Sequence, residues 1–106
     1  MKPRDVRDLV RFTEDEPTRQ TLFETERLWS QVVCIERNQT HGPVSDVSAD
    51  GLCVILAGEV AVQIGRGRAR MKQWDSIVIP AGDDLTVTNA STEPSVLLMV
   101  TAPPPS

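Results

Sequence analysis

The sequence predicts an all-β protein that folds as one small barrel or sandwich of short strands. From about residue 21 onwards, apolar and β-branched residues alternate with polar ones at a period of two, as they do on strands. Turn-forming residues interrupt this alternation roughly every ten residues, a spacing typical of all-β domains. The chain has 106 residues, which is enough for one hydrophobic core and too few for two domains.

The expected elements follow the chain in order. Residues 1–20 form a polar N-terminal segment, in which residues 5–12 are expected to make one short helix. Residues 21–102 form the barrel. Its strands are expected at residues 28–36, 51–58, 59–65, 76–82, 85–89 and 95–100. Residues 103–106 are rich in proline and are expected to be a disordered tail.

A stripe of cations lies between two of these strands, at a spacing of two residues. It consists of Arg66, Arg68, Arg70 and Lys72. On a strand these side chains share one face. We interpret them as a solvated outer face or an edge strand, where positive charge blocks pairing with another chain. An anion-binding stripe is the alternative, so the sequence leaves their role open.

Charge and hydropathy exclude several classes of partner. The net charge is −4 and the isoelectric point is near 4.9, and both values argue against nucleic acid. No apolar run approaches the roughly 18 residues of a membrane-spanning helix, so we expect no membrane partner. The start of the chain has no apolar segment typical of a secretion signal, and we therefore expect a cytoplasmic protein.

Few side chains offer nucleophilic or metal-binding chemistry. Cys34 and Cys53 both sit inside apolar runs and are interpreted as buried, reduced thiols, with a disulfide or a nucleophile as the alternative. His41 is the single histidine, and it precedes Gly42-Pro43 in an expected turn. We interpret it as an exposed loop residue, with a role as a ligand as the alternative.

A spaced set of turn residues identifies a family resemblance. Pro80, Gly82 and Asn89 fit the pattern G-x5-P-x-G-x2-H-x3-N, and Asp75 fits the residue after its first glycine. Gly58 fits the last position of the pattern G-x5-H-x-H-x3-E-x6-G. Through these residues the chain resembles the cupin family over residues 30–102. The resemblance implies a double-stranded β-helix, or jelly-roll, barrel. It also implies a homodimer, for which the apolar strand at 51–58 is suited to burial on both faces.

The metal-binding positions of the two cupin patterns lack metal ligands in this chain. Counting without a gap places Ser45, Val47 and Gly51 at the two histidines and the glutamate of the first pattern, and Leu85 at the histidine of the second. Divalent metals in such sites need imidazole and carboxylate groups. We therefore expect neither a metal nor any other cofactor.

The family orientation implies an apolar interior pocket. The candidate pocket residues are Ser45, Val47, Gly51, Cys53, Ile55, Leu85, Val87 and Asn89. An apolar pocket with a few polar groups is typical of small-molecule sites. We therefore expect a metal-free barrel that binds a small molecule or acts as a structural or accessory protein. The same space filled by core side chains is the alternative to an open pocket.

Two further functions stay open. The first is a metal-independent isomerase, cyclase or lyase that uses carboxylates at the mouth of the barrel, although no catalytic residue is assigned. The candidate carboxylates are Glu36, Asp46, Asp50, Asp83 and Asp84, and two of them converging inside the barrel would favour catalysis. The second is a regulatory barrel that senses a ligand.

Overall fold

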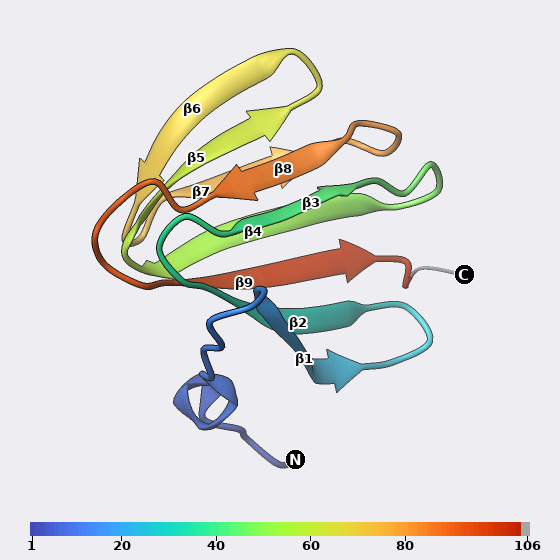
Figure 1. The fold of residues 1–106 in the computed structure, drawn as a ribbon. Helices are drawn as coiled ribbons and strands as arrows, with labels where there is room; N and C mark the ends of the chain where they lie inside the picture. The colour runs from blue at the N-terminus through green and yellow to red at the C-terminus, as the bar shows by residue number, and fades with distance from the viewer. Residues whose placement is uncertain (105–106) are drawn as a thin grey trace.

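The computed structural model describes residues 1–104 of the chain. In this range it forms one 3-10 helix, η1 (Val6–Leu9), and nine strands (Figure 1). The strands are β1 (Thr18–Glu24), β2 (Trp29–Ile35), β3 (Thr40–Val44), β4 (Asp50–Ala57), β5 (Glu59–Ile64), β6 (Gly67–Lys72), β7 (Ser76–Ile79), β8 (Leu85–Thr88) and β9 (Ser95–Ala102). The prediction of an all-β fold is confirmed.

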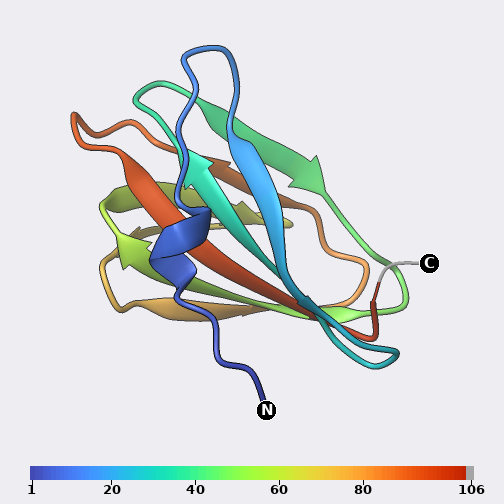
Figure 2. The same cartoon turned by 90° about the horizontal axis from the view of Figure 1, so that it is seen from below.

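The strands form two antiparallel sheets that face each other. The first sheet has five strands in the order β1-β2-β9-β4-β7, and the second has four in the order β3-β8-β5-β6. Figures 1 and 2 show the two layers from the side and from below. Chain neighbours such as β3 and β4 lie in different sheets, which is the crossing pattern of the predicted jelly roll.

The core lies between the two sheets. Ile35, Ile55 and Leu97 from the first sheet and Leu85 and Val87 from the second are each at most 1% exposed. Their placement follows the period of two, because Val60 and Val62 on β5 are buried while Glu59 and Gln63 are exposed. The alternation visible in the sequence therefore separates the inner face from the outer one.

The N-terminal segment is more ordered than its polar sequence suggests. The expected helix is a single 3-10 turn, and the side chain of Asp5 caps it by accepting a 2.9 Å hydrogen bond from the Arg7 amide. Leu9 and Phe12 pack against the outer face of the first sheet. β1 begins at Thr18, inside the polar N-terminal segment for which no strand was expected, because residues 18–24 pair with β2.

Two other expectations concern the ends of the barrel. β3 occupies a stretch that was expected to be a turn because it contains Gly42-Pro43. The stretch is a strand because it pairs with β8. The expected disordered tail at 103–106 lies partly outside the described residues, which end at 104. No helix of residues 1–104 is both long enough and apolar enough to cross a membrane.

The cationic stripe lies on and beside β6, which is an edge strand of the second sheet. Arg68, Arg70 and Lys72 are exposed. Arg70 lies 3.6 Å from the Glu59 carboxylate on β5, and both side chains are largely in solvent. This position fits the interpretation as a solvated edge, where such a pair contributes little stability.

Candidate ligand-binding site

A cavity of about 210 Å³ lies between the two sheets at one end of the barrel. The starts of β2, β4 and β8 meet there with the ends of β3, β7 and β9, and β1 contributes Arg19. At ~30 Å³ per water, the space corresponds to about seven water molecules. The cavity is therefore large enough for a small organic molecule.

The first sheet forms one wall of the cavity through cross-strand rows. One row of paired residues crosses four strands and consists of Trp29, Thr101, Gly51 and Ile79. Gln31 and Met99, which also pair, belong to the next row on the same face. Gly51 adds no side chain to its row and so leaves room. The wall combines apolar side chains with one amide and one hydroxyl.

A bulge in β3 shapes the opposite wall. His41 pairs with Val87 and Val44 pairs with Leu85, so β3 has one more residue between these pairs than β8 has. The extra residue allows both His41 and Val44 to face the cavity although they are three positions apart. Gly42, at φ +106°, makes the bend, and a Cβ there would collide with the carbonyl oxygen of Leu85.

His41 is buried, so the expectation of an exposed loop histidine is wrong. The residue is 2% exposed, and its register with Val87 turns the imidazole inward. Its Nε2 atom has no hydrogen-bond partner among residues 1–104. Burial lowers the pKa of His41 to about 4, and the nearby Arg19 guanidinium contributes to lowering that pKa. The imidazole is therefore neutral at pH 7.

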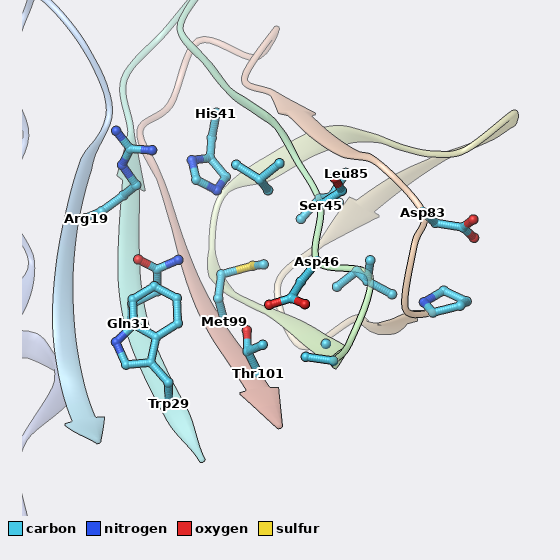
Figure 3. Close-up of a pocket in the computed structure, with 15 residues that line it drawn as sticks. Arg19, Trp29, Gln31, His41, Ser45, Asp46, Asp83, Leu85, Met99 and Thr101 are labelled. Carbon is cyan, nitrogen blue, oxygen red and sulfur yellow. The ribbon is translucent and has the colours of Figure 1, made fainter. Parts of the chain in front are cut away.

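The remaining polar groups lie on two sides of the cavity. Figure 3 shows Arg19 and Gln31 on the side of β1 and β2, and Ser45 and Asp46 on the side of the segment after β3. Arg19 lies on the inner face of the edge strand β1 because it pairs with Val33, a residue of the core, although its side chain is exposed. Asp46 is held in place by its Oδ1 atom, which accepts a 2.8 Å hydrogen bond from the Ser48 amide.

The predicted pocket residues fall into three groups. Ser45, Gly51 and Leu85 line the cavity. Val47 lies on the surface, 83% exposed, because the segment after β3 turns its side chain outward. The rest lie deeper: Cys53, Ile55, Val87 and Asn89 are fully buried and do not line the cavity. Three of the eight predicted residues therefore line the cavity, and the other five do not.

Asn89 has a structural position. Its Nδ2 donates hydrogen bonds to the carbonyl oxygens of Ile35 at 2.9 Å and Glu93 at 2.8 Å. Its Oδ1 accepts from the Ser91 amide at 3.1 Å and from the Ser91 hydroxyl at 2.8 Å. The side chain therefore ties the end of β8 to the end of β2 and to the loop before β9.

The candidate carboxylates do not converge. Asp46 and Asp83 both line the cavity, but in Figure 3 only the Asp46 carboxylate points toward Met99 and Thr101, whereas that of Asp83 points away. Asp50 instead accepts a 2.9 Å hydrogen bond from the Ala81 amide. Glu36 and Asp84 do not line the cavity. The arrangement leaves one carboxylate aimed into the site.

Several lining residues were not identified from the sequence, among them Arg19, Trp29, Gln31, Met99 and Thr101. One signal was available: Gln31 lies two and four positions before Val33 and Ile35, so it shares the inner face with core residues. A polar residue on an apolar face near a strand end indicates a cavity. Arg19 carried no such signal, because its strand is visible only through pairing with β2.

The residues at the cavity do not fit the divalent metal of cupin sites. Residues 1–104 contain no group of three or more His, Cys, Asp or Glu side chains that could hold a metal ion. Leu85, at the position of a ligand histidine, places an alkyl group at the cavity. Cys53 offers no thiolate, because burial raises its pKa to about 12. The site chemistry therefore comes from Arg19, Gln31, His41 and Asp46.

Solved structures share this fold over nearly the whole chain. The TT1209 protein of Thermus thermophilus is 28% identical, with a TM-score of 0.94 and coverage of 99% of this chain and 100% of that one. An uncharacterised protein with a double-stranded β-helix domain from Klebsiella pneumoniae subsp. pneumoniae is 22% identical, with a TM-score of 0.91 and coverage of 97% of this chain and 90% of that one.

A sugar phosphate isomerase of the cupin superfamily from Silicibacter pomeroyi shares the fold alone. It is 18% identical, with a TM-score of 0.66 and coverage of 72% of this chain and 50% of that one. No curated protein matches the sequence. The family model for the cupin domain matches residues 31–101. By this match, and by its jelly-roll fold, the chain belongs to the cupin family.

Proposed function

We propose that this cupin barrel binds a small molecule in the cavity, without the help of a metal. The observation that supports this function is the buried Nε2 atom of His41, which lacks a partner among residues 1–104 and belongs to a residue of the cavity wall. A buried polar atom left without a hydrogen bond costs about 1–3 kcal/mol. Nε2 itself has less than 1 Å² of accessible surface, so a molecule in the cavity supplies the missing partner when the imidazole turns toward it, and that hydrogen bond offsets this cost.

The composition of the walls supports the same function. Leu85, Met99 and Ile79 offer apolar surface, and a few polar groups stand at defined positions around them. Small-molecule sites commonly have this form, in which apolar contact gives affinity and a few polar groups fix orientation. A barrel with a purely structural role would gain more from a filled cavity, because empty space forfeits dispersion contacts.

The test is a thermal-shift screen against organic acids, aromatics, lactones and their neutral analogues. A ligand of the folded state raises its melting temperature. Ser45→Trp places an indole at the cavity and should remove the shift, since Ser45 is an exposed lining residue whose replacement leaves the core intact. Ser48→Trp, exposed and outside the lining, is the matched control. Silence across the screen contradicts the proposal.

A metal-independent isomerase, cyclase or lyase is the second candidate. It is favoured by the Asp46 carboxylate, which points into the cavity opposite the neutral imidazole of His41. A carboxylate and an imidazole can act as acid and base when both reach the substrate. If a ligand is converted, Asp46→Asn should abolish turnover but retain binding. Full turnover by this variant contradicts a catalytic role.

We also propose that the protein acts as a homodimer through the part of the outer face of the first sheet that β4 and β7 form. Leu52 and Val78 pair across β4 and β7 and are 38% and 60% exposed. Trp74, in the preceding turn, is 72% exposed. Exposed apolar residues that adjoin one another are typical of interfaces. Light scattering should give twice the chain mass, and Val78→Lys should return the protein to the monomer mass.

A further inference from the structure

We propose that the molecule bound in the cavity is a small carboxylic acid with a compact apolar body and one hydrogen-bond donor. Its carboxylate binds Arg19 and its donor faces Asp46. This inference rests on the proposed function, because it names the ligand class of the same cavity.

The first step concerns the cation. Arg19 lines the cavity at its solvent-exposed edge and forms no ion pair with any carboxylate among residues 1–104. Its guanidinium lies close enough to His41 to affect the imidazole electrostatically. Figure 3 shows the two side chains next to each other, with Gln31 further along β2 on the same side of the cavity. An unpaired guanidinium, an amide and an imidazole on one side of a cavity offer the donors that a carboxylate needs.

The second step limits the charge of the ligand. Arg19 is the single cation among the described lining residues, and Asp46 and Asp83 also line the cavity. A phosphate dianion would meet one positive charge and two negative ones. A carboxylate monoanion meets the same two aspartates, but its single charge is balanced by Arg19 and is repelled less than two charges would be. The charges of the walls therefore favour a carboxylic acid over a phosphate ester.

The third step concerns the opposite side. One oxygen of Asp46 accepts the amide of Ser48, which fixes the carboxylate and leaves the second oxygen available to accept. An ionised carboxylate only accepts hydrogen bonds, so it selects a donor on the ligand and repels a second anionic group. Met99 and Thr101 lie between the two polar sides, and the methionine gives an apolar surface for the body of the ligand.

The experiment compares four probes of one size in calorimetric titrations. They are mandelate, phenylglycine, phenylacetate, which lacks the donor, and mandelamide, which lacks the carboxylate. We expect mandelate or phenylglycine to bind at least tenfold more tightly than mandelamide, and also more tightly than phenylacetate. Arg19→Gln should remove the preference for the carboxylate, and Asp46→Asn should remove the preference for the donor. Arg37→Gln, exposed and outside the cavity lining, is the control and should change neither.

His41 gives a second measurement that needs no variant. Because it is the only histidine, its imidazole resonances in a nitrogen-15 spectrum are unambiguous. Mandelate or phenylglycine should shift the Nε2 resonance, whereas the same concentration of mandelamide should shift it less. An equal shift with mandelamide contradicts the carboxylate preference.

The outcomes separate this inference from the proposed function. If mandelamide binds as tightly as mandelate, or Arg19→Gln leaves the preference intact, the ligand class is wrong while binding in the cavity stands. If none of the four probes binds but neutral molecules of the thermal screen do, the ligand class is again wrong. If both experiments are silent, the proposed function is wrong as well.

Discussion

Replacing Asn89 by alanine should destabilise the barrel strongly. The side chain is fully buried and makes four hydrogen bonds, two as donor and two as acceptor. A typical hydrogen bond contributes about 0.5–1.5 kcal/mol net, so four give about 2–6 kcal/mol. In the variant the Ile35 carbonyl keeps the Ser95 hydroxyl as a donor, and the Ser91 hydroxyl, released from Asn89, can donate to the Glu93 carbonyl. We therefore expect a loss of about 2–4 kcal/mol.

The assay is urea unfolding at pH 7, supported by calorimetry. For a domain of this size, the loss corresponds to a fall in melting temperature of about 10–20 °C. Asn89→Asp tests the geometry, because it keeps the acceptor atom toward Ser91 but turns a second oxygen toward two carbonyl oxygens. It should be at least as destabilising at pH 7 and should recover partly as the carboxylate is protonated at lower pH.

The result that would refute this reasoning is a loss below about 1 kcal/mol in Asn89→Ala, since four hydrogen bonds at the low end of the range together contribute about 2 kcal/mol. A second check follows from position, because Asn89 does not line the cavity. The fraction of Asn89→Ala molecules that is folded should therefore bind any ligand of the cavity with the affinity of the unmodified protein.

Three further predictions follow from buried groups. The pKa of His41 falls from 6.5 to about 4 on folding, so the unfolded chain binds the proton more tightly and stability should decrease as the pH falls from about 6.5 to about 4. The decrease in the free energy of unfolding should reach about 3 kcal/mol in the unmodified protein and be missing in His41→Gln, as measured by urea unfolding. Equal pH profiles of the two proteins contradict this prediction. Both cysteines are buried, so a thiol reagent should label neither in the native protein and two per chain after denaturation, and rapid native labelling would contradict this. Finally, Leu85→His with Val47→His should cost stability without micromolar zinc affinity in a calorimetric titration, because Leu85 is 1% and Val47 is 83% exposed; tight zinc binding would reveal other ligands.

The sequence determined the elements that depend on local pattern. The alternation in residues 59–65 places Val60 and Val62 inside, and the structure agrees. Gly58 could be identified as the turn between two strands, and its φ of +82° explains why a glycine stands there. The family resemblance rested on such turn residues, because glycine and proline favour particular backbone angles by their residue type alone. Leu85 could likewise be recognised as an apolar residue in the place of a metal ligand.

The tertiary structure alone decided which of these residues meet at the cavity. His41 looked like a loop residue until its pairing with Val87 turned it inward, and Arg19 became a lining residue through its pairing with Val33. Asn89 could not be recognised as a structural tie, because its partners lie on another strand and in a loop. A period of two defines two faces of a strand, but partners and register depend on contacts between residues far apart in the chain. The cavity is built from such contacts, and so it appears only when the strands are assembled.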